Sequence, residues 1–175
     1  MFEPMADSDV PAVVALMNRA YRGAGSAAAW NSEAAYIAGD RTTADLLRAD
    51  LRASPKAQFL KWIEPADGAL AGCVWLEPLE GGTWYLGSLA ADPERQNEGL
   101  GRRLLAAAEE WVRAQGGTRV RMTVVNVRDT LIAWYVRRGY RPTGEIEPFP
   151  YGHNRFGTPL RDDLAFVVLE RDLVA

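Results

Sequence analysis

Apolar and polar positions in the first third of the chain follow helical spacing twice. Residues 9–23 carry apolar side chains on one helical face, and Asp9 is suited to cap the helix that they predict. Residues 24–41 have a weak pattern that favours a loop with a short helical piece. A second helix is expected from Thr42, with Asp45 three residues on as its capping-box partner.

The strand-like runs of this half are short, apolar and separated by turn signals. Asp67-Gly68 and Gly81-Gly82 divide three consecutive runs, which therefore predict an antiparallel meander. A shorter strand is expected near the start of the chain. The four predicted strands are residues 2–5, 57–65, 69–79 and 83–91.

The second half alternates between the two periodicities. A strong apolar stripe predicts a helix that Gly116-Gly117 ends, and a shorter helix is expected before Gly139. The chain has no repeat, linker or low-complexity stretch, so we expect one α+β domain over residues 1–175. The predicted elements are helices at 99–115 and 126–139 and strands at 119–125, 140–149 and 164–173.

Composition limits the class of protein. Hydrophobic residues make up 48% of the 175 and charged residues 25%, as in ordinary globular proteins. No apolar run approaches the roughly 20 residues that cross a bilayer, and no secretory signal is recognisable at the N-terminus, so no membrane contact is expected. A single cysteine, Cys73, precludes an internal disulfide. These features favour a cytoplasmic location.

Charge is unevenly distributed. The net charge of −3 gives no reason to expect nucleic acid as a partner. Residues 92–141, however, hold ten arginines and no lysine against six acidic residues, a formal charge of +4 that leaves −7 elsewhere. This basic third favours a small polyanion as ligand.

Two glycines stand where the strand at 83–91 gives way to the following helix. The first amides of a helix lack internal partners, and glycines at Gly99 and Gly101 let an anion approach them. The P-loop motif is excluded because Arg102 follows where it needs lysine, and the dinucleotide fingerprint is excluded because position 104 is leucine. A phosphate or pyrophosphate of another kind of ligand is the expected guest.

The segment "QNEGLG" at residues 96–101, with the strand before it and "WYVRRGY" at 134–140, resembles the GNAT superfamily of coenzyme A-dependent N-acetyltransferases. The resemblance extends over nearly the whole chain through the order of the predicted elements. It implies the GNAT fold, a mixed and mostly antiparallel sheet of six to seven strands flanked by about four helices. It also implies acetyl-CoA as co-substrate, with no metal.

The resemblance assigns the cofactor-binding residues by position. The backbone at the end of the strand at 83–91 is expected to bind the pantetheine arm, through Leu89, Ala90 and Ala91. The turn amides are expected to bind the pyrophosphate, helped by the side chains of Arg102 and Arg103. Arg128 stands where many relatives carry asparagine and is expected to reach the cofactor. The turn residues are Gln96, Asn97, Glu98, Gly99, Leu100, Gly101 and Arg102, of which Asn97 and Glu98 depart from the family's pattern.

Tyr135 occupies the place of the family's general acid, which protonates the thiolate that leaves when an amine attacks the thioester. A helical tyrosine in this position can also simply pack. The family's usual basic glutamate is missing from the strand at 83–91, so the base is expected elsewhere or is not needed. The candidates are Glu33, Glu77 and Glu145, each of which can also be an ordinary surface carboxylate.

Two segments are expected to form the acceptor pocket, residues 25–43 and 147–163. Their aromatic and charged side chains suit a small polar amine, and Arg41 or Arg155 is suited to hold a carboxylate on it. His153 is the one histidine in the chain, so no histidine metal cluster is expected. The pocket candidates are Trp30, Glu33, Tyr36, Arg41, Phe149, Tyr151, His153, Arg155 and Phe156.

Three functions follow from this reading. The first is a cytoplasmic acetyltransferase, monomeric or homodimeric, that acts on the amine of a small molecule. The second is an enzyme that acetylates a protein or peptide amine, which needs an open groove. The third is a non-catalytic domain that binds acyl-CoA, which agrees with the missing carboxylate in the strand at 83–91.

Overall fold

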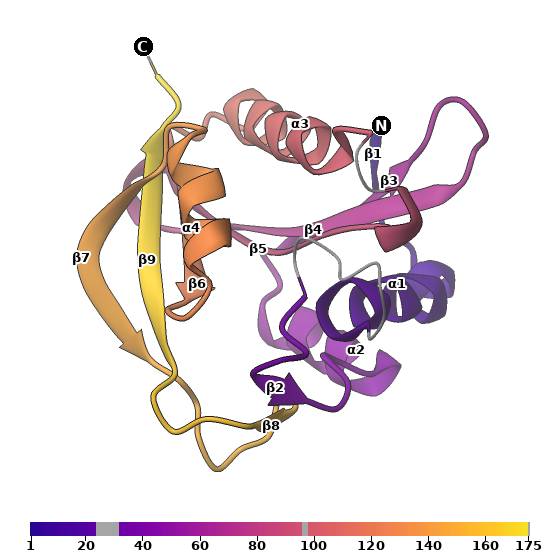
Figure 1. Ribbon diagram of the computed structural model, residues 1–175. Coiled ribbons are helices and arrows are strands. Elements are labelled where there is room, and N and C mark those ends of the chain that lie inside the picture. Colours follow the sequence, from indigo (N-terminus) through magenta and orange to yellow (C-terminus); the bar gives the residue numbers. More distant parts are fainter. Residues whose placement is uncertain (24–31, 96–97, 175) are drawn as a thin grey trace.

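The computed structural model describes residues 1–23, 32–95 and 98–174. One seven-stranded sheet has the order β1-β3-β4-β5-β6-β9-β7 and is flanked by four helices (Figure 1). The strands, in sheet order, are β1 (Phe2–Pro4), β3 (Gln58–Ile63), β4 (Leu70–Pro78), β5 (Thr83–Ala91), β6 (Arg119–Val125), β9 (Ala165–Asp172) and β7 (Arg141–Pro148). The helices are α1 (Val10–Arg22), α2 (Ala44–Ala53), α3 (Leu100–Ala114) and α4 (Asp129–Val136). The α+β class and the mixed, mostly antiparallel sheet are confirmed.

The sheet consists of two parts that meet at one short parallel contact. β3, β4 and β5 form the predicted antiparallel meander. β5 pairs with β6 in parallel only over Thr83–Tyr85 and Arg119–Arg121, after which no further pairing joins the two strands. β6, β9 and β7 continue as an antiparallel unit that stands across the direction of the meander (Figure 1). The sheet therefore opens between the distal halves of β5 and β6.

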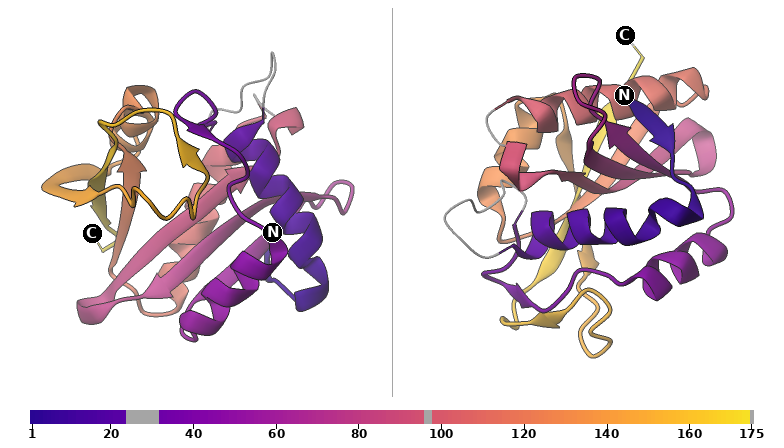
Figure 2. Two further views of the ribbon diagram at one scale, coloured as in Figure 1. Left: turned by 90° about the horizontal axis from the view of Figure 1, so that it is seen from below. Right: turned by 90° about the vertical axis from the view of Figure 1, so that its right-hand side faces the viewer.

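The helices cover both faces of the sheet. Leu104 and Val112 of α3 and Leu131 of α4 pack in one buried cluster with the sheet. Val13 of α1 and Leu47 of α2 belong to another cluster on the opposite face, and Figure 2 shows these two helices lying side by side. Burial of these apolar stripes is what the helical periodicity predicts. Within the part of the chain described, no helix has both the length and the apolar character needed to span a membrane.

Two predicted helix caps are wrong in detail. Asp9 makes no capping bond to α1, because its carboxylate accepts the Ala6 N–H at 2.8 Å and pairs with Lys61 at 2.9 Å. α2 is capped by Thr43 rather than Thr42, and the Thr43 hydroxyl accepts the Leu46 N–H at 3.2 Å. The expected capping box with Asp45 is therefore absent.

The sequence pattern missed a small second sheet, formed by β2 (Ile37–Ala38) and β8 (Thr158–Pro159). Strands of two residues are too short to produce a periodic pattern. The pairing fastens the connection before α2 to the connection between β7 and β9 (Figure 1). Gly157 is required here, since its φ is +101° and a Cβ would collide with the Ala38 carbonyl oxygen. The two segments predicted to form the acceptor pocket are thus held together.

Candidate active site

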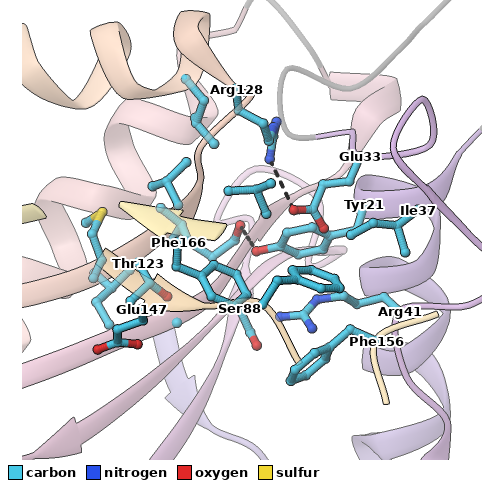
Figure 3. A pocket seen from close by; sticks show the side chains of 18 of the residues that line it. Tyr21, Glu33, Ile37, Arg41, Ser88, Thr123, Arg128, Glu147, Phe156 and Phe166 are labelled. Atoms are coloured by element: carbon cyan, nitrogen blue, oxygen red, sulfur yellow. Dashed lines mark hydrogen bonds and ion pairs between the residues drawn. The ribbon is translucent and has the colours of Figure 1, made fainter. Parts of the chain in front are cut away.

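A cavity of about 260 Å³ lies where the sheet opens between β5 and β6 (Figure 3). Its walls come from both strands, from α1 and α4, and from the two segments that the small sheet joins. The side chains are mostly apolar and aromatic, with a few polar groups, as is usual for small-molecule sites. Polar and ionisable groups on the walls include Tyr21, Glu33, Arg41, Tyr85, Thr123, Arg128, Tyr135 and Glu147.

β5 is irregular where it borders this cavity. The register with β4 shifts between Cys73 and Trp75, so that Ser88 and Leu89 together oppose one residue, and Ser88 has a φ of +50°. Such a bulge turns backbone groups away from the ladder. The Leu89 carbonyl accepts a hydrogen bond from the Tyr21 hydroxyl at 3.0 Å. Of the three residues expected at the pantetheine arm, Leu89 lines this cavity, Ala90 is buried against α1, and Ala91 lines a second pocket.

The second pocket, of about 510 Å³, surrounds the start of α3. Gly99 precedes the helix in the left-handed conformation, with φ of +68°, and a Cβ there would meet only the Arg102 guanidinium at 3.6 Å. This geometry leaves the first helical amides accessible, as an anion site needs. The expected residues Glu98, Gly99, Leu100, Gly101 and Arg102 all line the pocket, whereas Gln96 and Asn97 lie outside the described residues.

Four residues of this pocket were missed by sequence reasoning: Asp92, Arg95, Trp134 and Arg138. The Arg138 guanidinium lies 3.7 Å from the centroid of the Trp134 ring and donates to the Trp134 carbonyl at 2.8 Å. Burial, with the charges of Arg137 and Arg102, lowers the pKa of Arg138. Its Nε is buried and has no hydrogen-bond partner among the described residues. The helical spacing of Trp134 and Arg138, four residues apart, was the available signal.

Arg103, expected to help with phosphate, instead points to another partner. Its guanidinium donates to both carboxylate oxygens of Glu64, at 2.7 and 2.8 Å. It also lies over the Trp62 ring, 5.6 Å from the centroid. Arg103 is not among the residues that line the second pocket. Arg128 lines the first cavity rather than the second.

Tyr135 of α4 lines the first cavity and is only 5% exposed. Its ring packs edge-on against Tyr140, with centroids 5.6 Å apart. Burial raises the pKa of the Tyr135 hydroxyl, so the group keeps its proton throughout the neutral range. The position thus combines access to the cavity with a phenol that can donate a hydrogen bond.

The candidate bases are placed very differently. Glu33 lines the cavity but is buried and pairs with Arg22 at 3.2 Å and with Arg128 at 4.0 Å. Glu77 accepts the Trp75 indole N–H at 3.2 Å, and Glu145 pairs with Arg121 at 2.6 Å. Neither of these two is among the described residues that line the cavity, so their placement gives the predictions no support.

A carboxylate that sequence reasoning missed, Glu147 of β7, does line the cavity. Figure 3 shows it beside Thr123, on the side away from Arg41. Its side chain is 50% exposed, and its nearest ion pair is Arg121 at 3.6 Å, a cation that Glu145 and Glu170 contact more closely. Because β7 pairs through β9 with β6, residues 147, 166 and 125 point to the same face of the sheet. That non-local register is what no sequence pattern reveals.

The other acceptor-pocket candidates divide into two sets. Tyr151 has a structural role, since its hydroxyl donates to the Arg161 carbonyl at 2.8 Å and accepts the Leu164 N–H at 2.9 Å. Arg155 forms an ion pair with Asp50. Neither these two nor Tyr36 and His153 line the cavity, and Trp30 lies outside the described residues. The candidates that do line it are Glu33, Arg41, Phe149 and Phe156.

The mixed seven-stranded sheet, its flanking helices and the glycine before α3 agree with the fold that the resemblance to N-acetyltransferases implied. The family model of the acetyltransferase (GNAT) family matches residues 17–140, and the chain belongs to this family. The ribosomal-protein-S18-alanine N-acetyltransferase from Escherichia coli has the same fold, with a TM-score of 0.70 over 100% of this chain and 94% of that one, at 15% identity.

Curated relatives match over a shorter range. A mycothiol acetyltransferase of Beutenbergia cavernae is 31% identical over 102 residues, which make up 57% of this chain and 32% of that protein. The mycothiol acetyltransferase of Clavibacter michiganensis is 36% identical over 88 residues, or 46% of this chain and 28% of that protein. The matched part thus spans about a third of the length of these relatives.

Proposed function

We propose that the chain transfers the acetyl group of acetyl-CoA to the primary amine of a small molecule. The observation that carries the proposal is the pair of pockets joined by the end of β5, because Leu89 lines the first and Ala91 the second. One pocket suits a phosphorylated cofactor and the other a small acceptor. Two relatives named for acetylating mycothiol, a small molecule, also support an acceptor of this kind.

The second pocket fits the pyrophosphate of coenzyme A. Accessible amides at the start of α3 supply hydrogen-bond donors, and Arg102 and Arg138 supply positive charge. Burial and the charges of Arg137 and Arg102 lower the pKa of Arg138; an anion would stabilise its charged form and would give the buried Nε a partner. The bulge at Ser88–Leu89 turns the backbone of β5 toward the cavity, where the pantetheine arm is expected to bind.

Acetyl-CoA supplies an activated thioester, and residues of the first cavity supply the hydrogen-bond donor and the base. A neutral amine attacks the carbonyl carbon, the carbon–sulfur bond breaks, and the thiolate takes up a proton. Tyr135 donates a hydrogen bond or the proton to the departing sulfur. Because burial raises the pKa of Tyr135, complete proton transfer is less favourable than hydrogen bonding, and we assign it mainly the second role.

Glu147 is the carboxylate best placed to accept the proton of the attacking amine. Glu33, the other carboxylate on the described walls, is occupied by Arg22 and lies 4.0 Å from Arg128. Glu147 has water access through its exposed half and only a long contact to Arg121. A base at this position contributes typically 10²–10⁴-fold to the rate.

The test is calorimetric titration with acetyl-CoA, followed by detection of thiol release with a panel of small amines and peptides. Saturable binding with release that depends on a small amine supports the proposal. Release with peptides alone would favour a protein acceptor, and binding without release would favour a non-catalytic domain. Failure to bind acetyl-CoA would refute the proposal.

Glu147→Gln tests the assignment of the base, with Glu145→Gln as the matched change on the same strand and beside the same arginine. We expect Glu147→Gln to lower kcat about 100-fold at neutral pH, with a smaller deficit at high pH where the amine is already neutral. A larger loss in Glu145→Gln, or an unchanged pH profile in Glu147→Gln, would contradict the assignment.

A further inference from the structure

The wall of the first cavity that faces away from Glu147 carries an excess of positive charge. Arg41 and Arg128 line the cavity there, and Arg22 pairs with Glu33 of the same wall. One carboxylate, Glu33, is shared between Arg22 at 3.2 Å and Arg128 at 4.0 Å. Burial and the charges of Arg41 and Arg128 lower the pKa of Arg22, while Glu33 opposes that effect. Three guanidinium groups in this region are thus accompanied by one carboxylate, which pairs with two of them.

Arg41 is the member of this group whose positive charge is not balanced by a carboxylate among the described residues. Its guanidinium lies between two rings, with Cζ 5.0 Å from the centroid of Tyr21 and 4.5 Å from that of Phe156 (Figure 3). Among the described residues it has no ion pair and no side-chain hydrogen bond, and its Nε is buried without a partner. Stacking leaves the edge of a guanidinium, where the N–H groups point, open to a ligand.

The backbone at Arg41 is fixed from α1. The Asn18 side-chain oxygen accepts the N–H groups of Arg41 at 2.8 Å and of Thr42 at 3.2 Å. The Asn18 side-chain nitrogen donates to the Thr42 carbonyl at 3.0 Å. Three hydrogen bonds from the Asn18 side chain thus fix the backbone from which the Arg41 side chain extends into the cavity. A guanidinium held in this way loses less entropy when it binds a ligand.

We infer that the amine acceptor also carries a carboxylate and that Arg41 binds it. The inference rests on the proposed function and names its substrate class, a small amino acid or similar zwitterion. A planar carboxylate matches the free edge of a stacked guanidinium by two parallel hydrogen bonds. Glu147, the proposed base, lies on the opposite wall of the same cavity (Figure 3). The volume of about 260 Å³ restricts the acceptor to a small molecule.

Arg155, the alternative that the sequence offered for this role, is differently engaged. It pairs with Asp50 of α2 and does not line the cavity. The structure therefore separates two arginines that sequence reasoning treated alike. Only the one at position 41 presents an uncompensated charge to the acceptor space within the described residues.

The experiment compares alanine, methionine and phenylalanine, each with its own carboxamide, as acceptors. The pairs match in size, and the carboxamide has the more easily deprotonated amine because no carboxylate stabilises its ammonium form. Preference for the acids therefore cannot come from amine basicity. We expect wild-type protein to show a higher kcat/KM for the acid of at least one pair. Equal or better use of the carboxamides would overturn the inference.

Variants then locate the effect. Arg41→Gln is expected to raise the KM for the acid about 10- to 100-fold, the range of a lost charged hydrogen-bonded pair, and to leave the carboxamide unchanged. Arg41→Lys is expected to recover part of the preference, and the surface change Arg48→Gln to have no effect. An equal loss for acid and carboxamide in Arg41→Gln would show a packing role and overturn the inference. A loss of activity toward the acid alone in Arg155→Gln, and not in Arg41→Gln, would also overturn the inference.

The two proposals fail in distinguishable ways. Binding of acetyl-CoA with transfer only to uncharged amines, or to no member of the panel, refutes the carboxylate inference and leaves the cofactor assignment intact. Absence of acetyl-CoA binding refutes the proposed function itself. Binding of acetyl-CoA to Arg41→Gln at wild-type affinity is the control that separates the acceptor site from the cofactor site.

Discussion

The buried carboxylate of Glu109 provides the sharpest test of what holds α3 in place. Glu109 is 4% exposed, and its Oε1 accepts the Tyr140 hydroxyl at 2.9 Å. Arg171 of β9 donates to both of its carboxylate oxygens, at 2.9 and 2.8 Å. The network ties α3, the helix that starts at the second pocket, to the far half of the sheet. Glu109→Ala removes it.

The magnitude follows from burial. Breaking a buried ion pair costs about 3–5 kcal/mol because the remaining charge stays desolvated. The Arg171 side chain is 32% exposed and can recover some water, so the lower limit of about 3 kcal/mol applies. For a chain of this size the melting temperature should fall by about 6–12 °C. Tyr140→Phe, which removes one hydrogen bond to a charged group, should cost about 1.5 kcal/mol.

The neighbouring glutamate is a matched control. Glu110 lies on the same helix, but its side chain is 74% exposed and its pair with Arg113 is 3.3 Å long. Glu110→Ala should change stability by less than about 0.5 kcal/mol. Urea unfolding of both variants gives the comparison, and the Glu109→Ala/Tyr140→Phe double variant should cost less than the sum of the singles. Similar stabilities for Glu109→Ala and Glu110→Ala would refute this reasoning.

The other predictions concern the cofactor, the acid and pH. Gly99→Glu should abolish acetyl-CoA binding, as measured by calorimetry. Gly116→Glu, at the left-handed glycine that follows the other end of α3, should bind acetyl-CoA normally. Equal losses of binding in the two variants would indicate a folding defect instead. Tyr135→Phe should lower kcat about 100-fold at unchanged Kd for acetyl-CoA, and an unchanged kcat would remove its role. Burial raises the pKa of the Cys73 thiol to about 12, so the unfolded chain loses that proton first. The free energy of unfolding should therefore fall about 1.4 kcal/mol per pH unit from pH ~9 upward, and the same slope in Cys73→Ala would contradict this.

Elements with a long periodic signal were predictable. The strand predicted at 119–125 matches β6, and the helix predicted at 99–115 matches α3 to within one residue at each end. Both follow from local spacing, because one buried face imposes its period on the residues that form it. The glycine turn at 99–101 was predictable for the same reason, since helix-terminus physics depends on neighbouring residues alone.

The rest depends on contacts between residues far apart in the chain. Glu147 reaches the cavity through the register of β7 on β9 and of β9 on β6, which no local pattern encodes. Arg41 and Arg155 have the same chemistry in the sequence. They differ because Asp50 meets one of them and aromatic rings meet the other. Residues from both segments predicted for the acceptor pocket line the first cavity, but the sequence left open which of their side chains reach it.

The arginines of the basic third of the chain, residues 92–141, differ in whether they have a carboxylate partner. Most arginines of residues 92–141 pair with carboxylates, many of them in the acidic remainder of the chain, and so contribute little net field. Arg102, Arg137 and Arg138 have no ion pair among the described residues. Arg102 and Arg138 line the pocket at the start of α3, together with the carboxylates of Asp92 and Glu98. A pyrophosphate bound at the start of α3 would therefore have these two guanidinium groups and the helix amides as its positive partners. The compensated members are Arg95 with Asp67, Arg103 with Glu64, Arg113 with Glu110, Arg119 and Arg141 with Asp172, Arg121 with Glu170 and Arg128 with Glu33.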